Sequence, residues 1–160
     1  MYDFAPDPQL ATPERHRQLV QAAEALTAGE ADAVANMANI AALLWEFLPD
    51  LNWAGFYRVM DDELVLGPFV GRPACIRIPL GQGVCGVAAL EGDTQLVPDV
   101  HAFPGHIACD GATLSELVVP VMRKGKAIAV IDLDSPLSDR FTAEDADGIA
   151  KLAALLTDRI

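Results

Sequence analysis

Residues 116–133, ELVVPVMRKGKAIAVIDL, predict a β-hairpin. Two apolar runs rich in valine and isoleucine, Glu116–Met122 and Ala127–Leu133, flank the polar turn Arg123–Lys126. β-Branched residues favour strands, and a short turn that contains glycine favours antiparallel pairing of the strands on either side. We therefore expect an antiparallel sheet in this part of the chain.

Four further segments have strand character: Asn52–Val59, Glu63–Leu66, Cys75–Pro79 and Thr94–Val97. Met60-Asp61-Asp62 predicts a tight hairpin connection between the first two. Gly83–Leu90 is short and rich in alanine, so it suits a short helix. Residues 98–114 show neither pattern, and loops of this length inside a compact domain are often functional.

Three longer helices are predicted at the two ends of the chain. The first begins at Thr12-Pro13, with Thr12 as the cap, and the second runs from about Asp32 to Pro49 with an apolar stripe from Val34 to Leu48. The last begins at Thr142, with Asp145 as its capping-box partner. Together the elements predict an α+β fold, a six-stranded antiparallel sheet with the N- and C-terminal helices on one face.

Composition narrows the class of protein. The 160 residues correspond to one domain, 1–160, in which residues 1–11 are a loose lead-in. With 52% hydrophobic residues, the chain can form a core without disulfides, and it has no apolar run of about 18 residues that could span a membrane. A net charge of −12 disfavours nucleic acid and anionic lipid as partners. The N-terminus is acidic where a secretory signal would be basic, so we expect a cytoplasmic protein.

The chain has three cysteines, Cys75, Cys85 and Cys109. An odd number in a reducing compartment argues against a structural disulfide framework. They are inert core residues, metal ligands or redox thiols. Because Cys109 lies in the long loop with His101 and His106, we favour a functional thiol there.

Alternation along the segment 75–80 places Cys75 and Arg77 on one face and Ile76 on the other. If the apolar face meets the helices, Cys75 points outward beside a guanidinium that favours its thiolate. Cys85 lies near the start of a predicted short helix, where a thiolate is also favoured, although a small residue packed under the sheet is an equal alternative.

A zinc site of three cysteines with His101 or His106 is a rival interpretation. Close ligand pairs are mostly missing, because Cys75 and Cys85 lie ten residues apart and Cys109 follows 24 later. We therefore predict no metal.

Acidic residues mark the ends of the hairpin strands. Asp132 and Asp134 share a face, and a pair of carboxylates favours a cationic group such as an α-ammonium. Glu116 opens an apolar strand, where desolvation would keep its carboxyl protonated and able to act as an acid. Solvated strand ends are the alternative for all three.

Two aromatic residues flank a glycine in the first strand. Trp53, Gly55 and Tyr57 share one face, so Gly55 leaves a gap between two rings that could hold a small apolar group beside sulfur. Ordinary sheet aromatics are the alternative.

Six longer motifs are present: NWAGFY (52–57), LGPF (66–69), GRPACIRIP (71–79), GVCG (83–86), LVPDVHAFPGHIACD (96–110) and SELVVP (115–120). Together they resemble the free methionine-(R)-sulfoxide reductase family. The resemblance runs from about residue 13 to the C-terminus. It implies a GAF fold, usually dimeric, and reduction of the free amino acid sulfoxide. Gln82 departs from the family pattern, in which a lysine is expected.

The resemblance also implies roles for the candidate residues. Cys109 is the nucleophile, Cys75 the recycling thiol and Cys85 an additional cysteine, while Glu116, Asp132 and Asp134 hold the substrate and Trp53 and Tyr57 surround its S-methyl group. The implied chemistry is a sulfenic acid followed by an intramolecular disulfide, which a thioredoxin-type partner reduces, with no metal or organic cofactor. A non-catalytic GAF sensor is the alternative function.

Overall fold

The computed structural model describes residues 6–7, 9–107 and 110–160. One six-stranded antiparallel sheet has the strand order β3-β2-β1-β6-β5-β4. Its strands are β1 (Trp53–Met60), β2 (Glu63–Gly71), β3 (Arg77–Pro79), β4 (Gln95–Val97), β5 (Ser115–Arg123) and β6 (Lys126–Ser135). The hairpin predicted from residues 116–133 is therefore confirmed as β5 and β6, and β6 pairs with β1 in the middle of the sheet.

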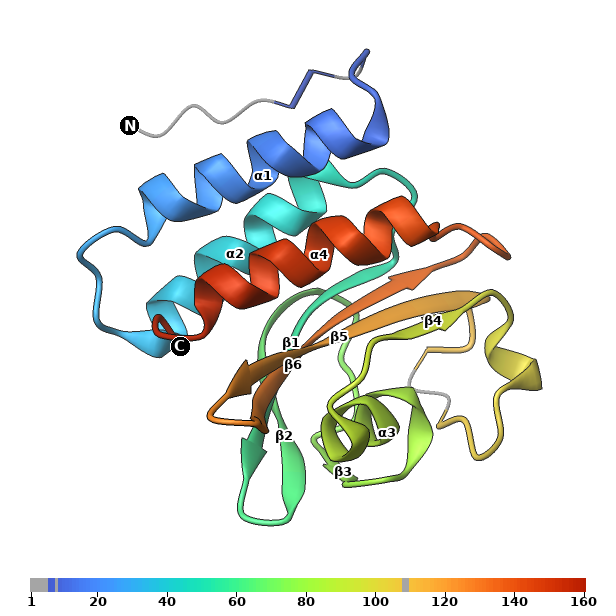
Figure 1. The fold of residues 1–160 in the computed structure, drawn as a ribbon. Helices are drawn as coiled ribbons and strands as arrows, with labels where there is room; N and C mark the ends of the chain where they lie inside the picture. The colour runs from blue at the N-terminus through green and yellow to red at the C-terminus, as the bar shows by residue number, and fades with distance from the viewer. Residues whose placement is uncertain (1–5, 8, 108–109) are drawn as a thin grey trace.

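The helices divide between the two faces of the sheet (Figure 1). α2 (Ala33–Phe47) and α4 (Ala143–Leu156) pack on one face, and α1 (Thr12–Leu26) packs against these two helices on the same side of the sheet. α3 (Gly83–Glu91) packs on the other face. A 3-10 turn, η1 (Val100–Ala102), lies in the long loop between β4 and β5. The α+β architecture with terminal helices on one face is confirmed. Within the described residues, no helix combines the length and apolarity of a membrane span.

Local capping explains where the helices begin. The Thr142 side chain accepts a hydrogen bond from the backbone N–H of Asp145, whose carboxyl accepts one from Thr142 N–H, so the predicted capping box is confirmed. Asp32 caps α2 in the same way by accepting from Ala35 N–H at 2.8 Å. The predicted Thr12 cap is wrong by one position, because α1 already begins at Thr12.

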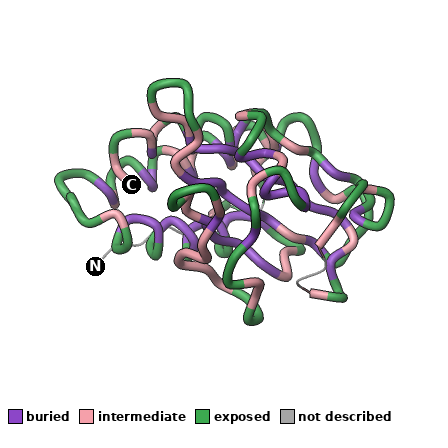
Figure 2. The backbone as a smooth tube through the Cα atoms, turned by 90° about the horizontal axis from the view of Figure 1, so that it is seen from below, coloured by how far each residue is buried: buried purple, intermediate pink, exposed green. Residues whose placement is uncertain are grey.

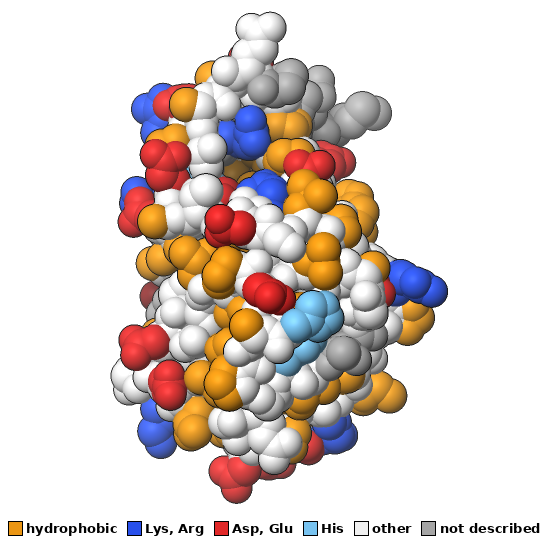
Figure 3. Space-filling view, turned by 90° about the vertical axis from the view of Figure 1, so that its right-hand side faces the viewer, with side chains coloured by type: hydrophobic (Ala, Val, Ile, Leu, Met, Phe, Trp, Pro, Cys, Tyr) orange, Lys and Arg blue, Asp and Glu red, His pale blue; other side chains and the backbone are white. Residues whose placement is uncertain are grey.

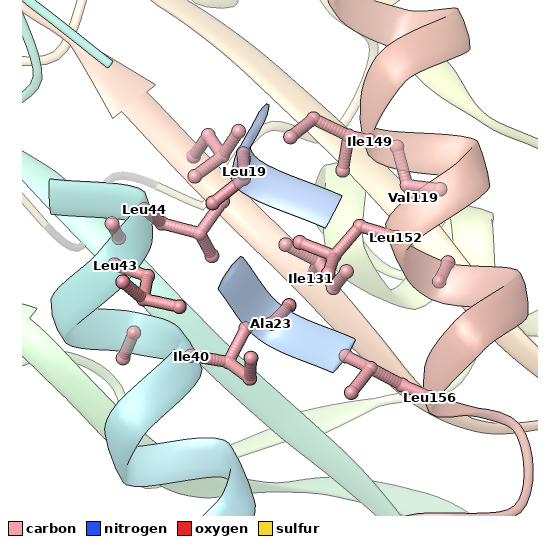
Figure 4. Close-up of a cluster of buried hydrophobic side chains, with 14 of the residues drawn as sticks. Leu19, Ala23, Ile40, Leu43, Leu44, Val119, Ile131, Ile149, Leu152 and Leu156 are labelled. Atoms are coloured by element: carbon pink, nitrogen blue, oxygen red, sulfur yellow. The ribbon is translucent and has the colours of Figure 1, made fainter. Parts of the chain in front are cut away.

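The sheet separates two clusters of buried side chains. The larger lies between the sheet and α1, α2 and α4, and includes Leu19, Ile40 and Leu152 with Ile131 of β6 (Figure 4). The smaller lies under α3 and includes Val130, the neighbour of Ile131. Figure 2 shows buried backbone through the centre and exposed backbone at the turns. Alternation along β6 therefore places Asp132 on the α3 side.

Residues 72–76 form an irregular connection between β2 and β3, whereas a strand was predicted from Cys75 onward. β2 continues to Gly71, whereas β3 begins only at Arg77, so Cys75 does not lie in a strand. The predicted orientation is wrong: Ile76 is 70% exposed, and Cys75 is half-buried against the smaller cluster. The ladder between β2 and β3 ends at the Val65–Arg77 pair, so the regular pleat that alternation requires is absent at Cys75.

Candidate active site

A pocket opens on the α3 side of the sheet, where β1, β5, β6 and the start of α3 meet the loops that precede β3 and β5. It brings together residues from six separate parts of the chain. Figure 3 shows histidine side chains on the surface of one side of the molecule, with an acidic side chain next to them. Its lining comprises Trp53, Tyr57, Arg72, Pro73, Ala74, Ile78, Gly83, Val84, Cys85, His106, Ile107, Asp110, Thr113, Glu116, Asp132 and Asp134.

Three carboxyls form the polar wall of the pocket. Glu116 of β5 pairs directly with Asp134 of β6, and Asp132 lies two residues along on the same face. Glu116 is 6% exposed and Asp132 5% exposed. The prediction that the two aspartates share a face is confirmed, and the solvated alternative is wrong for Glu116 and Asp132.

Burial changes the protonation of this acid cluster, defined as Glu116, Asp132 and Asp134. Burial raises the pKa of Glu116 well above its usual range, and the charges of Asp132 and Asp134 raise it further. Burial raises the pKa of Asp132 to about 7. The pKa of Asp134 is also raised, by burial and then by Asp132 and Asp110. The carboxyls of the cluster therefore keep their protons to a higher pH than exposed carboxyls would.

Cys85 lies against this acid cluster as a buried free thiol. Its Sγ is 3.9 Å from Oε1 of Glu116. Burial, and then the charges of Asp132 and Glu116, raise the pKa of the thiol well above its usual value. The predicted stabilisation of its thiolate is wrong, because desolvation and like charge outweigh the effect of a nine-residue helix.

The aromatic side of the pocket is a stack of rings. Trp53 stacks on Tyr57, with centroids 5.9 Å apart, and on Phe69 at 5.2 Å. The gap predicted at Gly55 is wrong, because a Cβ there would lie 2.4 Å from Cβ of Phe69. Gly55 thus permits close approach of β2, and Trp53 and Tyr57 both line the pocket.

Of the two cysteines predicted to form the redox pair, the structure describes Cys75 but not Cys109. The Tyr57 hydroxyl donates a hydrogen bond of 2.9 Å to the carbonyl oxygen of Cys75, and the preceding Ala74 lines the pocket. Cys109 lies outside the described residues. Ile107 and Asp110, close to it in sequence, both line the pocket.

Asn52 fixes the end of the long loop. Its side-chain amide donates to Oδ2 of Asp110 at 3.2 Å and to Oγ1 of Thr113 at 3.0 Å. Asn52, Thr113 and Arg72 were not predicted as site residues. Only the presence of Asn52 and Arg72 inside the quoted motifs could have indicated them.

Cys85, Glu116 and Asp132 also form a group with the chemistry of a metal site. One ligand atom from each lies within 4.8 Å of the others. Nε2 of His106 is 4.0 Å from Oε2 of Glu116, and burial, followed by the nearby His101, lowers the pKa of His106. This set differs from the three-cysteine zinc site considered from the sequence.

Comparison with known proteins identifies the family. The family model of the GAF domain matches residues 35–160. The free methionine-R-sulfoxide reductase of Escherichia coli is 54% identical over 82% of this chain and 80% of that protein. The enzyme of the same name from Saccharomyces cerevisiae is 45% identical over 87% of this chain and 82% of that protein.

A solved structure of similar fold carries the same name. The free methionine-R-sulfoxide reductase of Neisseria meningitidis, in complex with its substrate, superposes with a TM-score of 0.94 at 42% identity, covering 99% of this chain and 95% of that one. The chain therefore belongs to the free methionine-R-sulfoxide reductase family of GAF domain proteins.

Proposed function

We propose that this protein reduces free methionine-(R)-sulfoxide to methionine with its own thiols, as a single GAF domain over residues 1–160. The observation that carries the proposal is the buried acid cluster facing an aromatic wall in one pocket. Relatives above 40% identity carry the name of this activity, one of them with substrate bound.

The pocket chemistry suits a free amino acid. The α-ammonium group binds at the acid cluster, where buried negative charge favours a cation. The S-methyl group packs against Trp53 and Tyr57, because sulfur and aromatic rings attract one another. Arg72 also lines the pocket, and its guanidinium can pair with the α-carboxylate. A methionine sulfoxide within a peptide has no ammonium and would leave the buried acids unpaired.

The proposed reaction transfers oxygen from one sulfur to another. The Cys109 thiolate attacks the sulfoxide sulfur while Glu116 donates a proton to the sulfoxide oxygen. The hydroxyl group then moves from the substrate sulfur to the Cys109 sulfur as the bond between the two sulfurs breaks, so methionine leaves and Cys109 becomes a sulfenic acid. Cys75 then attacks this sulfur, which releases water and forms a disulfide, and a dithiol of the thioredoxin type reduces the disulfide. Cys85 is the additional thiol, available to trap the sulfenic acid when Cys75 is absent.

We also propose that the protein is a cytoplasmic homodimer. Most of the stripe from Val34 to Leu48 packs within this chain, but α2 keeps an apolar outer face. Val34 is 52% and Trp45 39% exposed, and Ala38 and Ala42 are exposed between them. Small residues on a helix face permit close packing of a second copy. Light scattering should give twice the monomer mass, and Ala42→Arg should give a monomer.

Consumption of NADPH by a thioredoxin system, with the two diastereomers supplied separately, tests the function. The R form should be turned over and the S form left nearly untouched. A sensor without catalytic activity would consume no NADPH with either, and equal rates with both forms would also contradict the proposal.

A further inference from the structure

Cys85, Glu116 and Asp132 place one sulfur and two carboxylates around a single point of the pocket. Their ligand atoms lie within 4.8 Å of one another. A tetrahedral zinc ion with bonds of 2.0–2.3 Å separates its ligand atoms by about 3.3–3.8 Å. Side-chain movements of about 1 Å would therefore close the three groups around an ion.

Asp132 provides an independent sign of an external ligand. Its Oδ1 is buried and finds no hydrogen-bond partner among the residues that the structure describes, although the residue is only 5% exposed. An unpaired buried oxygen is unfavourable unless something outside the chain satisfies it. Asp132 lies on β6 between β1 and β5, so the backbone that carries this oxygen is held on both sides.

A fourth possible donor, His106, lies beside Glu116. Nε2 of His106 lies 4.0 Å from Oε2 of Glu116 and only 14% of its side chain is exposed. One sulfur, one imidazole nitrogen and two carboxylates suit zinc and cadmium, whereas magnesium and calcium prefer oxygen alone.

We propose that the reduced protein binds one zinc-type divalent cation at Cys85, Glu116 and Asp132, with His106 as the fourth ligand. Binding displaces the Cys85 proton into solvent, so the ion is held by a thiolate. The ion is an inhibitor rather than a cofactor. Its inhibitory effect rests on the proposed function, because the ion occupies the carboxylates that bind the substrate ammonium.

The test isolates Cys85 as the only thiol. The Cys75→Ser/Cys109→Ser variant is titrated with Cd²⁺, and the thiolate-to-cadmium absorption band in the ultraviolet is followed. One equivalent should develop the band, and the further change Cys85→Ser should abolish it. Asp132→Asn should weaken binding at least about tenfold. His101→Ala, which alters an exposed histidine beside His106, should leave the affinity unchanged. Circular dichroism checks that each variant is folded.

Absence of the band in the single-thiol variant would overturn the proposal, as would an unchanged affinity in Asp132→Asn. Because the band is read without turnover, it separates this site from the proposed function. If the band forms but the wild-type protein reduces no sulfoxide, the metal site is supported and the proposed function is contradicted. In the active enzyme, Zn²⁺ should compete with methionine sulfoxide and Mg²⁺ should not.

Discussion

The Tyr57 hydroxyl donates a hydrogen bond of 2.9 Å to the carbonyl oxygen of Cys75. Tyr57 is 1% exposed, and burial, with the charges of the surrounding acids, raises the pKa of its hydroxyl, which therefore stays protonated as a donor. The same side chain forms the aromatic wall and holds the segment that carries the proposed recycling thiol.

Tyr57→Phe separates these two roles, because it keeps the ring and removes the donor. We expect the thioredoxin-driven kcat to fall roughly fivefold, equivalent to about 1 kcal/mol for one hydrogen bond. A single turnover that yields one methionine should keep its rate. Tyr57→Leu, which also removes the ring, should slow both. Equal slowing of both steps in Tyr57→Phe would show that the hydroxyl acts on the first attack.

Asp132→Asn should change the pH dependence of the single-turnover rate. The negative charge of Asp132 is one cause of the raised pKa of Glu116, so its removal lowers that pKa. A general acid works only below its pKa, and the pH range in which the rate falls should therefore move to lower pH. Asp62→Asn, in the exposed β1–β2 turn, is the control. If the pH range in which the rate falls is the same in Asp132→Asn as in the unmodified protein, Glu116 is not the general acid.

The three thiols should separate in single-turnover experiments. Cys109→Ser should form no methionine, since no attack on sulfur remains. Cys75→Ser should still form one methionine per site and retain a sulfenic acid that dimedone labels, while cycling with thioredoxin collapses. If Cys109→Ser gives a stoichiometric burst and Cys85→Ser does not, the nucleophile is Cys85.

A buried pair outside the pocket should govern stability in acid. His16 Nε2 and Asp145 Oδ1 are 2.9 Å apart, and both residues are buried. Burial alone would raise the pKa of Asp145, but hydrogen bonds from His16 and Thr142 and the charge of Arg140 lower it to about 2. Because the folded pKa lies below the unfolded value, this stabilisation is complete above about pH 4 and is lost as pH falls toward 2.

Asp145→Asn should therefore lower the free energy of unfolding at pH 7 by roughly 3 kcal/mol and flatten its decline between pH 4 and 2. Urea unfolding at several pH values measures both effects. Asp147→Asn removes an exposed partner of Lys151 and should change stability by less than about 0.5 kcal/mol. Equal effects of the two substitutions would contradict the importance of the buried pair.

Sequence patterns predicted the elements that obey a regular period. The hairpin of β5 and β6, the capping box at Thr142 and the shared face of Asp132 and Asp134 follow from strand alternation and local hydrogen bonding. These features depend on residues close in sequence, so the pattern contains the information.

The errors occurred where distant segments decide the local structure. Cys75 lies in an irregular connection fixed by Tyr57, and Phe69 of β2 fills the space over Gly55. The Cys85 thiol meets carboxyls that are more than 30 residues away in sequence. Burial and charge at these positions depend on tertiary packing, and the spacing of apolar residues along a single strand or helix contains no information about it. Asn52 was missed for the same reason, since its partners lie on the far loop.

The most direct measurement compares kcat/KM for free methionine-(R)-sulfoxide with that for its N-acetyl derivative, using thioredoxin as reductant. The derivative keeps the sulfoxide and the S-methyl group but lacks the ammonium that the acid cluster binds. We predict that its kcat/KM is lower by about 100-fold or more, because a buried charged site left without its partner loses about 3 kcal/mol. Equal values for the two compounds would contradict recognition of the free amino acid by Glu116, Asp132 and Asp134.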